Sequence, residues 1–314
     1  MGGGLAGSGA VAVVRNPGAG GGRAQREWDE LEAQLRAVAP RPAIFTTRYP
    51  GHAAALTREA LYDGYDRIVS AGGDGTHHEV VNGFFWDGAP INPKAALAPL
   101  PLGTGSDLVR TIGLSRRRVA TLFEAPRLFA ADVGEAEYET FEGGRGRSYF
   151  INAACFGTGG RVAERVNRSR GRLLAFPRAL LWEVLRLRAN HFEITVDNER
   201  LEGRFAEVAV ANARYYGGGI CLNRAIRLDS GQLEVIAIHE VGLAKAVVNL
   251  PRFFRGRITQ YPHLAWHARG SEIAIRCTDA ALPATLDGEL PGNLPARIRV
   301  LPKAIQLLVP AYSA

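Results

Sequence analysis

The stretch DRIVSAGGDGTHHEVVNGFF, residues 66–85, contains three local signals in a row. Residues 68–70 (IVS) are typical of the end of a short buried β-strand, and a glycine turn follows them (Gly72, Gly73, Gly75). Thr76 stands where a helix N-cap is wanted, because apolar residues recur after it at helical spacing (Val80, Val81, Phe84). This order predicts a phosphate-binding loop, since backbone N–H groups and the helix dipole both favour an anion.

Asp74 lies within this glycine turn. A carboxylate repels phosphate, so its presence is consistent with phosphate binding only if a divalent cation lies between the two groups. The alternative is that Asp74 only caps a tight turn.

Two more stretches repeat the order of strand, glycine loop and helix. The β-branched residues 11–14 precede a loop of Asn16, Pro17, Gly18, Ala19 and Gly20. The apolar residues 95–100 precede PLGTGSD, which contains Thr104 and Asp107. A further strand, residues 43–47, ends at Thr47. Ligands bind at the carboxyl ends of the strands in open α/β sheets, so these loops predict one shared site; an ordinary βα connection and a capping charge at Asp107 are the alternatives.

Composition excludes several classes of protein. The chain has 314 residues, 46% of them hydrophobic and 22% charged, which is ordinary for a globular protein with room for two cores. No apolar run approaches the roughly 20 residues of a membrane span, and the first ten residues do not resemble a signal peptide. The three lysines (Lys94, Lys245, Lys303) lie outside the glycine loops, which excludes a Walker A loop. Three widely spaced cysteines suit a reducing cytoplasm and a packing role (Cys155, Cys221, Cys277).

The second half of the chain has a different sequence pattern from the first. After about residue 130, short β-like runs separated by turn signals predict an antiparallel β domain with inserted helices, with strands at 131–133, 148–153, 191–196, 206–211, 233–238, 272–277, 282–286 and 297–301. Within it, residues 161–191 alternate arginines, from Arg161 to Arg188, with apolar residues. This pattern is typical of a helix at an anionic membrane surface, or of a helix that covers the β domain and exposes a basic face. No nucleic-acid-binding motif accompanies the arginines, so we expect no nucleic-acid partner.

Four motifs together resemble the diacylglycerol kinase catalytic-domain family. Residues 71–76 resemble its GGDGT signature, which NAD kinases share, and Asp287-Gly288-Glu289 resembles its DGE motif. Residues 16–20 resemble its NPxSG motif with Ala19 in place of serine, and residues 101–110 its PxGTxNDxAR motif with Ser106 in place of asparagine. The resemblance implies an N-terminal Rossmann-like, NAD-kinase-like α/β domain over residues 1–130, to which residues 302–314 return. It also implies a C-terminal antiparallel β-sandwich over residues 131–301.

The resemblance also implies a set of site residues. The glycine loops would hold the phosphates of ATP, and Thr47 and Thr104 would contact the nucleotide. Asp74, supported by Asp107 and Asp287, would organise Mg²⁺, and Glu289 would accept the proton of the acceptor hydroxyl. In many bacterial members an Asp-Asp-Gly segment holds a structural magnesium; here Asp229-Ser230-Gly231 interrupts that pair, so a plain turn at Asp229 is the favoured alternative.

The function implied is that of an ATP- and Mg²⁺-dependent lipid kinase, cytoplasmic and peripherally associated with an anionic membrane. The acceptor stays open among diacylglycerol-, phosphatidylglycerol-, ceramide- and sphingoid-type lipids, and a homodimer is also open. Two rival interpretations remain. An NAD kinase would share residues 72–76 without needing Asp287-Gly288-Glu289, and a non-catalytic lipid-binding protein would fit the departures at Ala19, Ser106 and Ser230.

Overall fold

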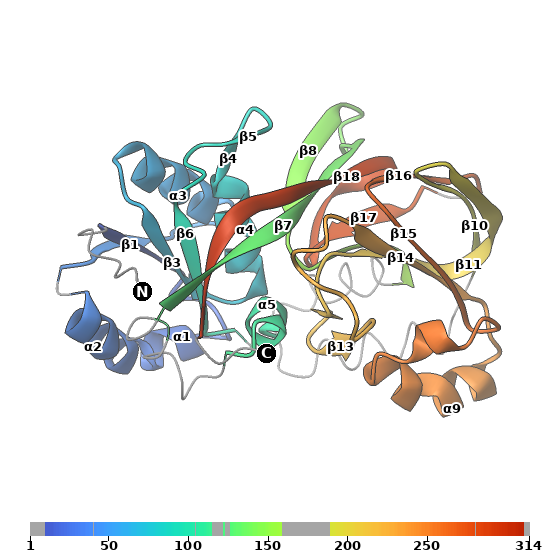
Figure 1. Cartoon of the computed structure of the whole chain (residues 1–314), viewed down its shortest axis with the longest axis horizontal. Helices are drawn as coiled ribbons and strands as arrows, with labels where there is room; N and C mark the ends of the chain where they lie inside the picture. Colours follow the sequence, from blue (N-terminus) through green and yellow to red (C-terminus); the bar gives the residue numbers. More distant parts are fainter. Residues whose placement is uncertain are drawn as a thin grey trace, which may run out of the picture. The chain divides into compact units, whose positions relative to one another are not determined.

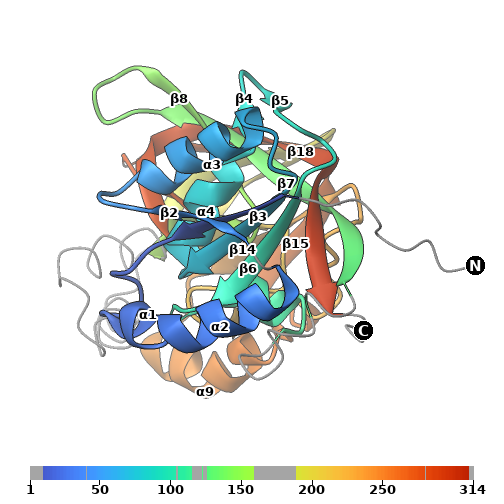
Figure 2. The same ribbon diagram turned by 90° about the vertical axis from the view of Figure 1, so that its left-hand side faces the viewer.

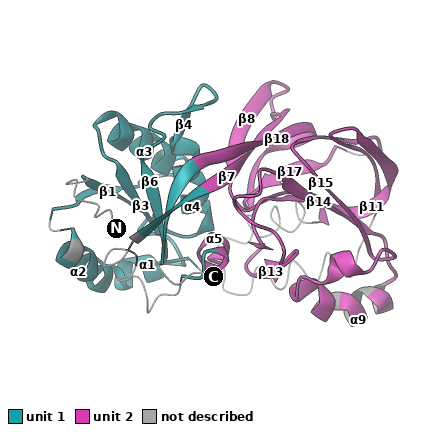
Figure 3. Ribbon diagram, viewed as in Figure 1, with its two compact units in different colours: residues 1–103, 112–130, 305–314 teal, residues 104–111, 131–304 magenta. Residues whose placement is uncertain are grey.

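The computed structural model of the chain describes residues 10–39, 41–103, 105–114, 122, 126–158, 189–279 and 281–310. The chain divides into two compact units (Figure 3). Unit 1 comprises residues 1–103, 112–130 and 305–314, and unit 2 comprises residues 104–111 and 131–304. The slightly different boundaries expected from the family resemblance remain a prediction. None of the helices in the described part of the chain is long and apolar enough to cross a membrane.

Unit 1 is built on a parallel sheet with the strand order β2-β1-β3-β6 (Figure 1). Its strands are β1 (Val11–Arg15), β2 (Ala43–Thr46), β3 (Arg67–Gly72) and β6 (Ala96–Pro101). The end of β18 (Glu289–Pro310) adds a fifth parallel strand beside β6, where Gln306 pairs with Ala96. The central strands are buried along nearly their whole length, as expected for a parallel sheet that helices cover on both faces.

The helices of unit 1 lie on both faces of this sheet. They are α1 (Arg23–Arg26), α2 (Trp28–Val38), α3 (His52–Tyr62) and α4 (Asp74–Gly83). A short hairpin of two paired strands, β4 (Phe85–Trp86) and β5 (Ala89–Pro90), follows α4. Figure 2 shows α3 and α4 on one face of the sheet and α1 and α2 on the other. The direction of the connections therefore reverses between β1 and β3, which makes the carboxyl ends of these two strands the topological switch point of the sheet.

Unit 2 is an antiparallel β structure. Its strands are β7 (Pro126–Glu139, which begins in unit 1), β8 (Arg145–Phe150), β9 (Ala153–Gly157), β10 (Asn190–Val196), β11 (Glu199–Ala211), β12 (Tyr215–Tyr216), β13 (Ile220–Cys221), β14 (Leu233–His239), β15 (Ala265–Gly270), β16 (Glu272–Cys277), β17 (Pro283–Leu286) and the first part of β18. Its helical elements are α5 (Asp107–Thr111), α9 (Leu243–Phe254) and the 3₁₀ turn η2 (Ile258–Gln260). A large apolar cluster fills its centre, with Phe150, Phe156 and Phe192 fully buried.

Long strands of unit 2 change partners along their length. The first part of β11 pairs with β10, and after an irregularity between Phe205 and Glu207 the second part pairs with β9, while β14 lies along its other edge. Similarly, β18 pairs first with β17 and then with β16. Bulges and partner changes of this kind let one long strand serve two layers of a sandwich.

The structure differs from the sequence-based expectations at several places in unit 2, among them the short strands β12 and β13, which were not predicted. Residues 148–153 were predicted as one strand, but β8 ends at Phe150 and β9 begins at Ala153. The backbone amides at this break bond to a distant side chain, Asp287, in place of a ladder partner. Strand β15 and helix α9 were not predicted, because the short AWHARG strand has one large apolar residue and the helical stretch contains Pro251.

Candidate active site

The loops after β1 and β3 bond to each other at the switch point of unit 1. The side-chain amide of Asn16 donates a hydrogen bond to the hydroxyl oxygen of Thr76 over 3.0 Å. The backbone N–H of Asn16 donates to the carbonyl of Ala71 over 2.9 Å. Two of the motifs found in the sequence, which lie 60 positions apart, therefore form one structure.

The loop after β6 packs against the same structure. Its Leu102 N–H donates to the carbonyl of Gly72 over 3.1 Å, and the guanidinium of Arg23 donates to the carbonyl of Gly103 over 2.8 Å. The backbones of Gly73 and Gly103 approach so closely that a Cβ atom on Gly103 would lie 2.4 Å from the Cα atom of Gly73. Glycine is required at this crossing because any side chain would force the two loops apart.

Helix α4 begins at Asp74, three residues earlier than the predicted N-cap at Thr76 implies. The N-cap is Gly73 in extended backbone, and no side chain caps it. The interpretation of Thr76 as the N-cap was therefore wrong: Thr76 lies buried in the first turn, where its hydroxyl accepts from Asn16 instead of bonding to the helix start. The first backbone N–H groups of a helix have no partner within the helix, so this open start is suited to an anion. Asp74 is half-buried there.

Helix α3 has the opposite arrangement, because a carboxylate already occupies its N-terminus. The two oxygens of Glu79, on α4, accept the backbone N–H groups of Gly51 and Ala53 over 2.8 and 2.9 Å. Thr47, which was predicted to contact the nucleotide, donates its N–H to the carbonyl of Arg15 at the end of β1. Glu79 thus fixes the loop after β2 and leaves α4 as the helix of this pair with an uncapped start. Sequence reasoning missed Glu79 because its partners are 26 and 28 positions away.

Asp107 lies in unit 2, at the start of α5, and is buried. One carboxylate oxygen accepts from the Arg110 guanidinium over 3.1 Å, and the other accepts from the backbone N–H of Gly218 over 2.8 Å. The Arg110 guanidinium also lies 5.5 Å from the ring centre of Tyr215. Asp107 therefore joins α5 to the glycine run at 217–219, and this contact was not predicted.

Ser106, immediately before α5, has the left-handed backbone conformation, with φ of 58°. Asparagine adopts this conformation much more readily than serine does, which gives a physical reason for an asparagine at this position in the motif. Thr104, predicted to contact the nucleotide, lies outside the described residues, as do residues 161–188 with their arginines.

Asp287 and Gly288 form the two-residue turn between β17 and β18, and both have positive φ, as a type I′ hairpin turn requires. The Asp287 carboxylate is not simply solvated. One oxygen accepts the N–H groups of Asn152 and Ala153 over 2.8 and 3.0 Å, and the other accepts that of Ile151 over 2.9 Å. The carboxylate therefore holds the hairpin against the break between β8 and β9, and Glu289 is exposed at the first position of β18.

We expect Asp287→Asn to lower the free energy of unfolding by about 2–3 kcal/mol, because a neutral amide replaces a charge acceptor and its NH₂ group faces a backbone donor. Asparagine adopts positive φ well, so the turn itself is not the cause. The measurement is the midpoint of urea unfolding at unchanged slope. Glu289→Gln, which changes charge at the neighbouring exposed position, is the control; equal midpoints for the two variants would contradict the anchoring role of Asp287.

The buried Cys155 thiol and the half-buried Tyr216, both near these carboxylates in unit 2, have perturbed acidities. Burial raises the pKa of the Cys155 thiol well above its usual range, and the carboxylates of Glu207 and Asp287 add to the effect. Burial likewise raises the pKa of Tyr216, with contributions from Cys155, Glu207 and Asp107. Both groups therefore stay protonated at neutral pH, and Cys155 is not a thiolate nucleophile. Glu207 is itself buried, and no local pattern around it predicts this.

Asp229, the predicted structural metal ligand, pairs with Arg227 through both oxygens, over 2.9 and 3.0 Å. The Arg227 guanidinium holds the pKa of Asp229 below its ordinary value. The neighbouring turn is held by Asp132, whose fully buried carboxylate accepts the N–H groups of Gly231 and Lys303. Within the described ranges, no three His, Cys, Asp or Glu side chains are grouped as metal ligands. The ion at Asp229 stays a prediction, and the observed contacts are those of a turn.

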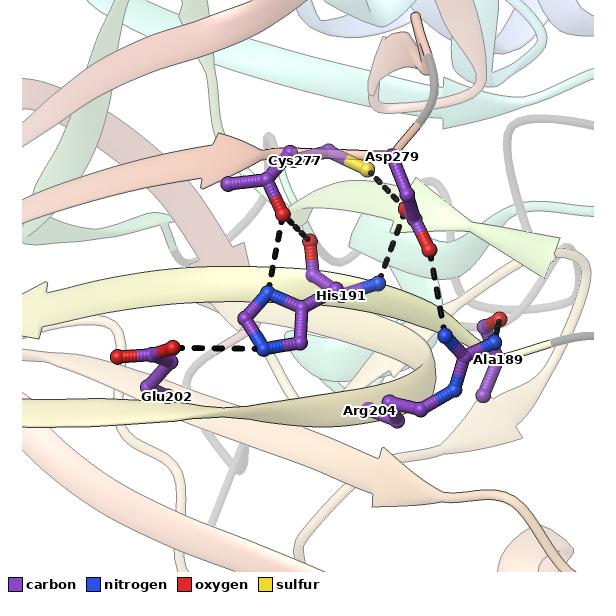
Figure 4. Close-up of polar contacts among 7 residues, drawn as sticks. Ala189, His191, Glu202, Arg204, Cys277 and Asp279 are labelled. Carbon is purple, nitrogen blue, oxygen red and sulfur yellow. Dashed lines mark hydrogen bonds and ion pairs between the residues drawn. The ribbon is translucent and has the colours of Figure 1, made fainter.

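A separate polar cluster in unit 2 contains none of the predicted site residues (Figure 4). Asp279 accepts the backbone N–H of His191 over 3.0 Å, the thiol of Cys277 over 3.2 Å, and forms an ion pair with Arg204 at 3.4 Å. Arg204 also donates to the carbonyl of Ala189 over 2.6 Å. These contacts fasten the start of β10 to β11 and to the end of β16, which is a structural role.

A parallel sheet with three glycine loops at the carboxyl ends of its strands, joined in one chain to an antiparallel β unit, defines the class as a two-unit α/β protein. Comparison with known families agrees with this class. Residues 10–135 match the diacylglycerol kinase catalytic domain, and residues 152–309, half of the chain, match the YegS C-terminal NAD kinase beta sandwich-like domain.

Similar proteins extend over almost the whole chain. A diacylglycerol kinase of Bacillus subtilis (strain 168) is 24% identical over 313 residues, covering 96% of this chain and 97% of that protein. The crystal structure of a diacylglycerol kinase from Bacillus anthracis str. Sterne has a TM-score of 0.72 at 20% identity and covers 98% of both chains. Yeast NADH kinase complexed with NADH has a TM-score of 0.54 at 13% identity, covering 96% of this chain and 84% of that one. At these identities the two structures bear on the fold alone.

The chain belongs to the diacylglycerol kinase catalytic-domain family, and is accordingly a phosphotransferase with an alcohol group as acceptor. The predicted fold class, an NAD-kinase-like α/β part with a C-terminal β-sandwich, is also confirmed. Membership of a kinase family implies ATP as the phosphate donor.

Proposed function

We propose that this protein is an ATP- and Mg²⁺-dependent lipid kinase that works in the cytoplasm at a membrane surface. It transfers the γ-phosphate of ATP to a hydroxyl of a diacylglycerol-, phosphatidylglycerol-, ceramide- or sphingoid-type lipid. The observation that carries the proposal is the meeting of three glycine loops around the uncapped start of α4, with Asp74 as its first residue.

Backbone amides at this place would bind the phosphates. The N–H groups of Gly20 and Gly21 have no hydrogen-bond acceptor among the described residues, and those of the first turn of α4 point away from the helix. Arg23 is held beside them by its bond to Gly103. These donors, together with Thr47 and Thr104 as nucleotide contacts, would fix the nucleotide before the reaction, which is most of what phosphoryl transfer asks of a protein.

The chemistry of the donor set fits a magnesium ion held partly by substrate. Mg²⁺ keeps several waters and binds through one or two carboxylates together with substrate phosphates, where it neutralises the developing charge. Asp74 lies at the helix start, where phosphates would bind, and its carboxylate would supply a hard oxygen ligand. Asp107 and Asp287 each accept hydrogen bonds from backbone N–H groups within unit 2. They would therefore support the site by positioning loops.

Glu289 would accept the proton of the lipid hydroxyl. It is exposed, and it follows a turn whose conformation is fixed by the three bonds to Asp287. A carboxylate on a rigid turn is held in position for general-base work, which typically contributes about 10²–10⁴-fold to a rate.

The test is a panel assay with purified protein, ATP and Mg²⁺. Diacylglycerol, phosphatidylglycerol, ceramide, a sphingoid base and NAD are offered separately, and products are identified by mass spectrometry. We expect one lipid class to gain a phosphate and NAD to remain unchanged. Phosphorylation of NAD with no lipid product would instead identify an NAD kinase, and binding of lipid without turnover under any divalent metal would identify a non-catalytic lipid-binding protein.

A further inference from the structure

Helix α9 of unit 2 presents an exposed face made of basic and apolar side chains. Lys245, Val248, Arg252 and Arg255 recur at intervals of three and four residues, so they share one side of the helix. The side chain of Val248 is 67% exposed and that of Phe254, at the end of the helix, is 42% exposed. Arg252 is half-buried, because it donates to Asn249 and its guanidinium lies 4.9 Å from the ring centre of Tyr261, whereas Lys245 and Arg255 are exposed. We call these residues, with the exposed Arg224 and Arg257, the α9 surface.

The charge of this region has one sign. The sequence contains no aspartate or glutamate between Glu240 and Glu272, and four basic residues lie on or just after α9 (Lys245, Arg252, Arg255, Arg257). The fifth basic residue of this stretch, Arg269, lies on β15 and pairs with Glu234. Arg224 joins them from another loop, because its guanidinium donates to the carbonyl of Arg255 over 3.1 Å. Within the described part of the chain, no carboxylate forms an ion pair with Arg224, Arg257 or any basic residue of α9.

Helix stability does not account for this arrangement. Arginines near the C-terminus of a helix interact favourably with its dipole, which is sufficient for Arg252 and Arg255. Lys245, however, lies in the first turn, where a positive charge is unfavourable and where α9 has no acidic residue. The side of α9 that packs on the fold is a different one: Phe253 packs on the apolar cluster that includes Ile258 and Leu264. The exposed apolar and basic side chains therefore need an explanation outside the fold.

We propose that the α9 surface docks on an anionic membrane. Basic side chains reach lipid phosphates while Val248 and Phe254 enter the boundary between headgroups and acyl chains, which is how amphipathic helices bind membranes from the side. Each basic residue near such a surface strengthens binding about fivefold, equivalent to about 1 kcal/mol. A nucleic acid would use the charges but leave Val248 and Phe254 in water, and a second copy of the chain would have to bring an acidic patch to this surface.

The docking surface is independent of the phosphotransfer site, because none of its residues belongs to the glycine loops or the acidic motifs. Membrane binding is therefore measurable without ATP or turnover. The experiment compares sedimentation of the full chain with vesicles of phosphatidylcholine alone and with vesicles in which phosphatidylglycerol makes up about a third of the lipid. We expect binding to the anionic vesicles, weakened by salt as charge screening requires.

Two variants remove the two halves of the interaction. Lys245→Gln with Arg255→Gln is expected to weaken binding to anionic vesicles at least about tenfold, and Val248→Ser with Phe254→Ser is expected to weaken it by several-fold. The matched control is Arg200→Gln with Arg276→Gln, which removes the same charge from two exposed positions on β11 and β16 and should bind like the wild type. Thermal unfolding of all variants shows that each is folded.

Different outcomes separate this inference from the proposed function. If both α9 variants bind anionic vesicles as tightly as the control, the α9 surface is not the docking site and another segment, such as residues 161–188, makes the contact. A different result would be a wild type that binds no vesicles but self-associates, with the self-association lost in the α9 variants. That result would contradict membrane docking and would identify a second copy of the chain as the partner of the α9 surface. If the wild type binds vesicles through α9 but phosphorylates no lipid, the proposed function fails while the docking surface stands.

Discussion

Glu289→Gln is expected to lower kcat for lipid phosphorylation by about 10²–10⁴-fold, with little change in the KM for ATP. The glutamine keeps the size and hydrogen-bonding oxygen of the side chain but has no basic oxygen to take the hydroxyl proton. Because Glu289 is exposed and begins β18, the change costs the fold almost nothing. The measurement is a steady-state assay on the lipid that the panel identifies.

The control for this substitution is Glu199→Gln, which removes the same charge at an exposed position on β11 and should retain full activity. A normal kcat in Glu289→Gln, with stability unchanged, would remove Glu289 from the reaction. In that case the proton of the acceptor hydroxyl would have to leave through another group or through water.

Asp74→Asn is expected to lower kcat/KM by about 10³-fold and to raise the Mg²⁺ concentration needed for half-maximal activity. The first effect has the size usually seen when one charged stabiliser of a transition state is lost. The second follows because an amide oxygen is a weaker ligand for Mg²⁺ than a carboxylate. Loss of the favourable interaction of Asp74 with the helix dipole adds at most about 1 kcal/mol of instability, so most of the protein stays folded.

The control for Asp74→Asn is Asp63→Asn, which removes a negative charge from an exposed position after α3 in the same unit. The Mg²⁺ requirement of this control should match that of the wild type. Two results would count against the metal role of Asp74: an unchanged Mg²⁺ titration in Asp74→Asn, or an activity loss that follows unfolding. Either would support the simpler interpretation of Asp74 as a residue that only shapes the turn.

The sequence was informative wherever one short segment determines the structure. The glycine loops after β1, β3 and β6 were predictable because strand, loop and helix each leave a local pattern, and parallel strands bring their carboxyl ends to one edge. The alternation of buried and exposed residues likewise predicted most strands of unit 2. Helix α9 was missed because Pro251 lies inside it and Gly242 precedes it, and both residues suggest a loop.

Contacts between distant segments were not predictable. Asp287 was predicted to support a magnesium ion, yet its carboxylate accepts hydrogen bonds from three backbone amides 134 to 136 positions away. Glu79 and Asp107 have the same property, since each bonds to amides in another element. Which amides face a carboxylate depends on strand register and loop packing, and neither follows from the residues beside it.

The last strand of the chain has a practical consequence for fragments. Unit 1 is discontinuous in sequence, because residues 306 and 307 of β18 pair with β6 after the chain has passed through all of unit 2. A fragment that stops near residue 130 would leave the outer hydrogen-bonding groups of β6 uncovered, as would a proteolytic cut late in β18. Bare strands of this kind recruit strands from other molecules. Soluble expression of unit 1 by simple truncation is therefore a poor strategy, whereas a circularly permuted gene that fuses the tail ahead of residue 10 would keep that strand in the same polypeptide.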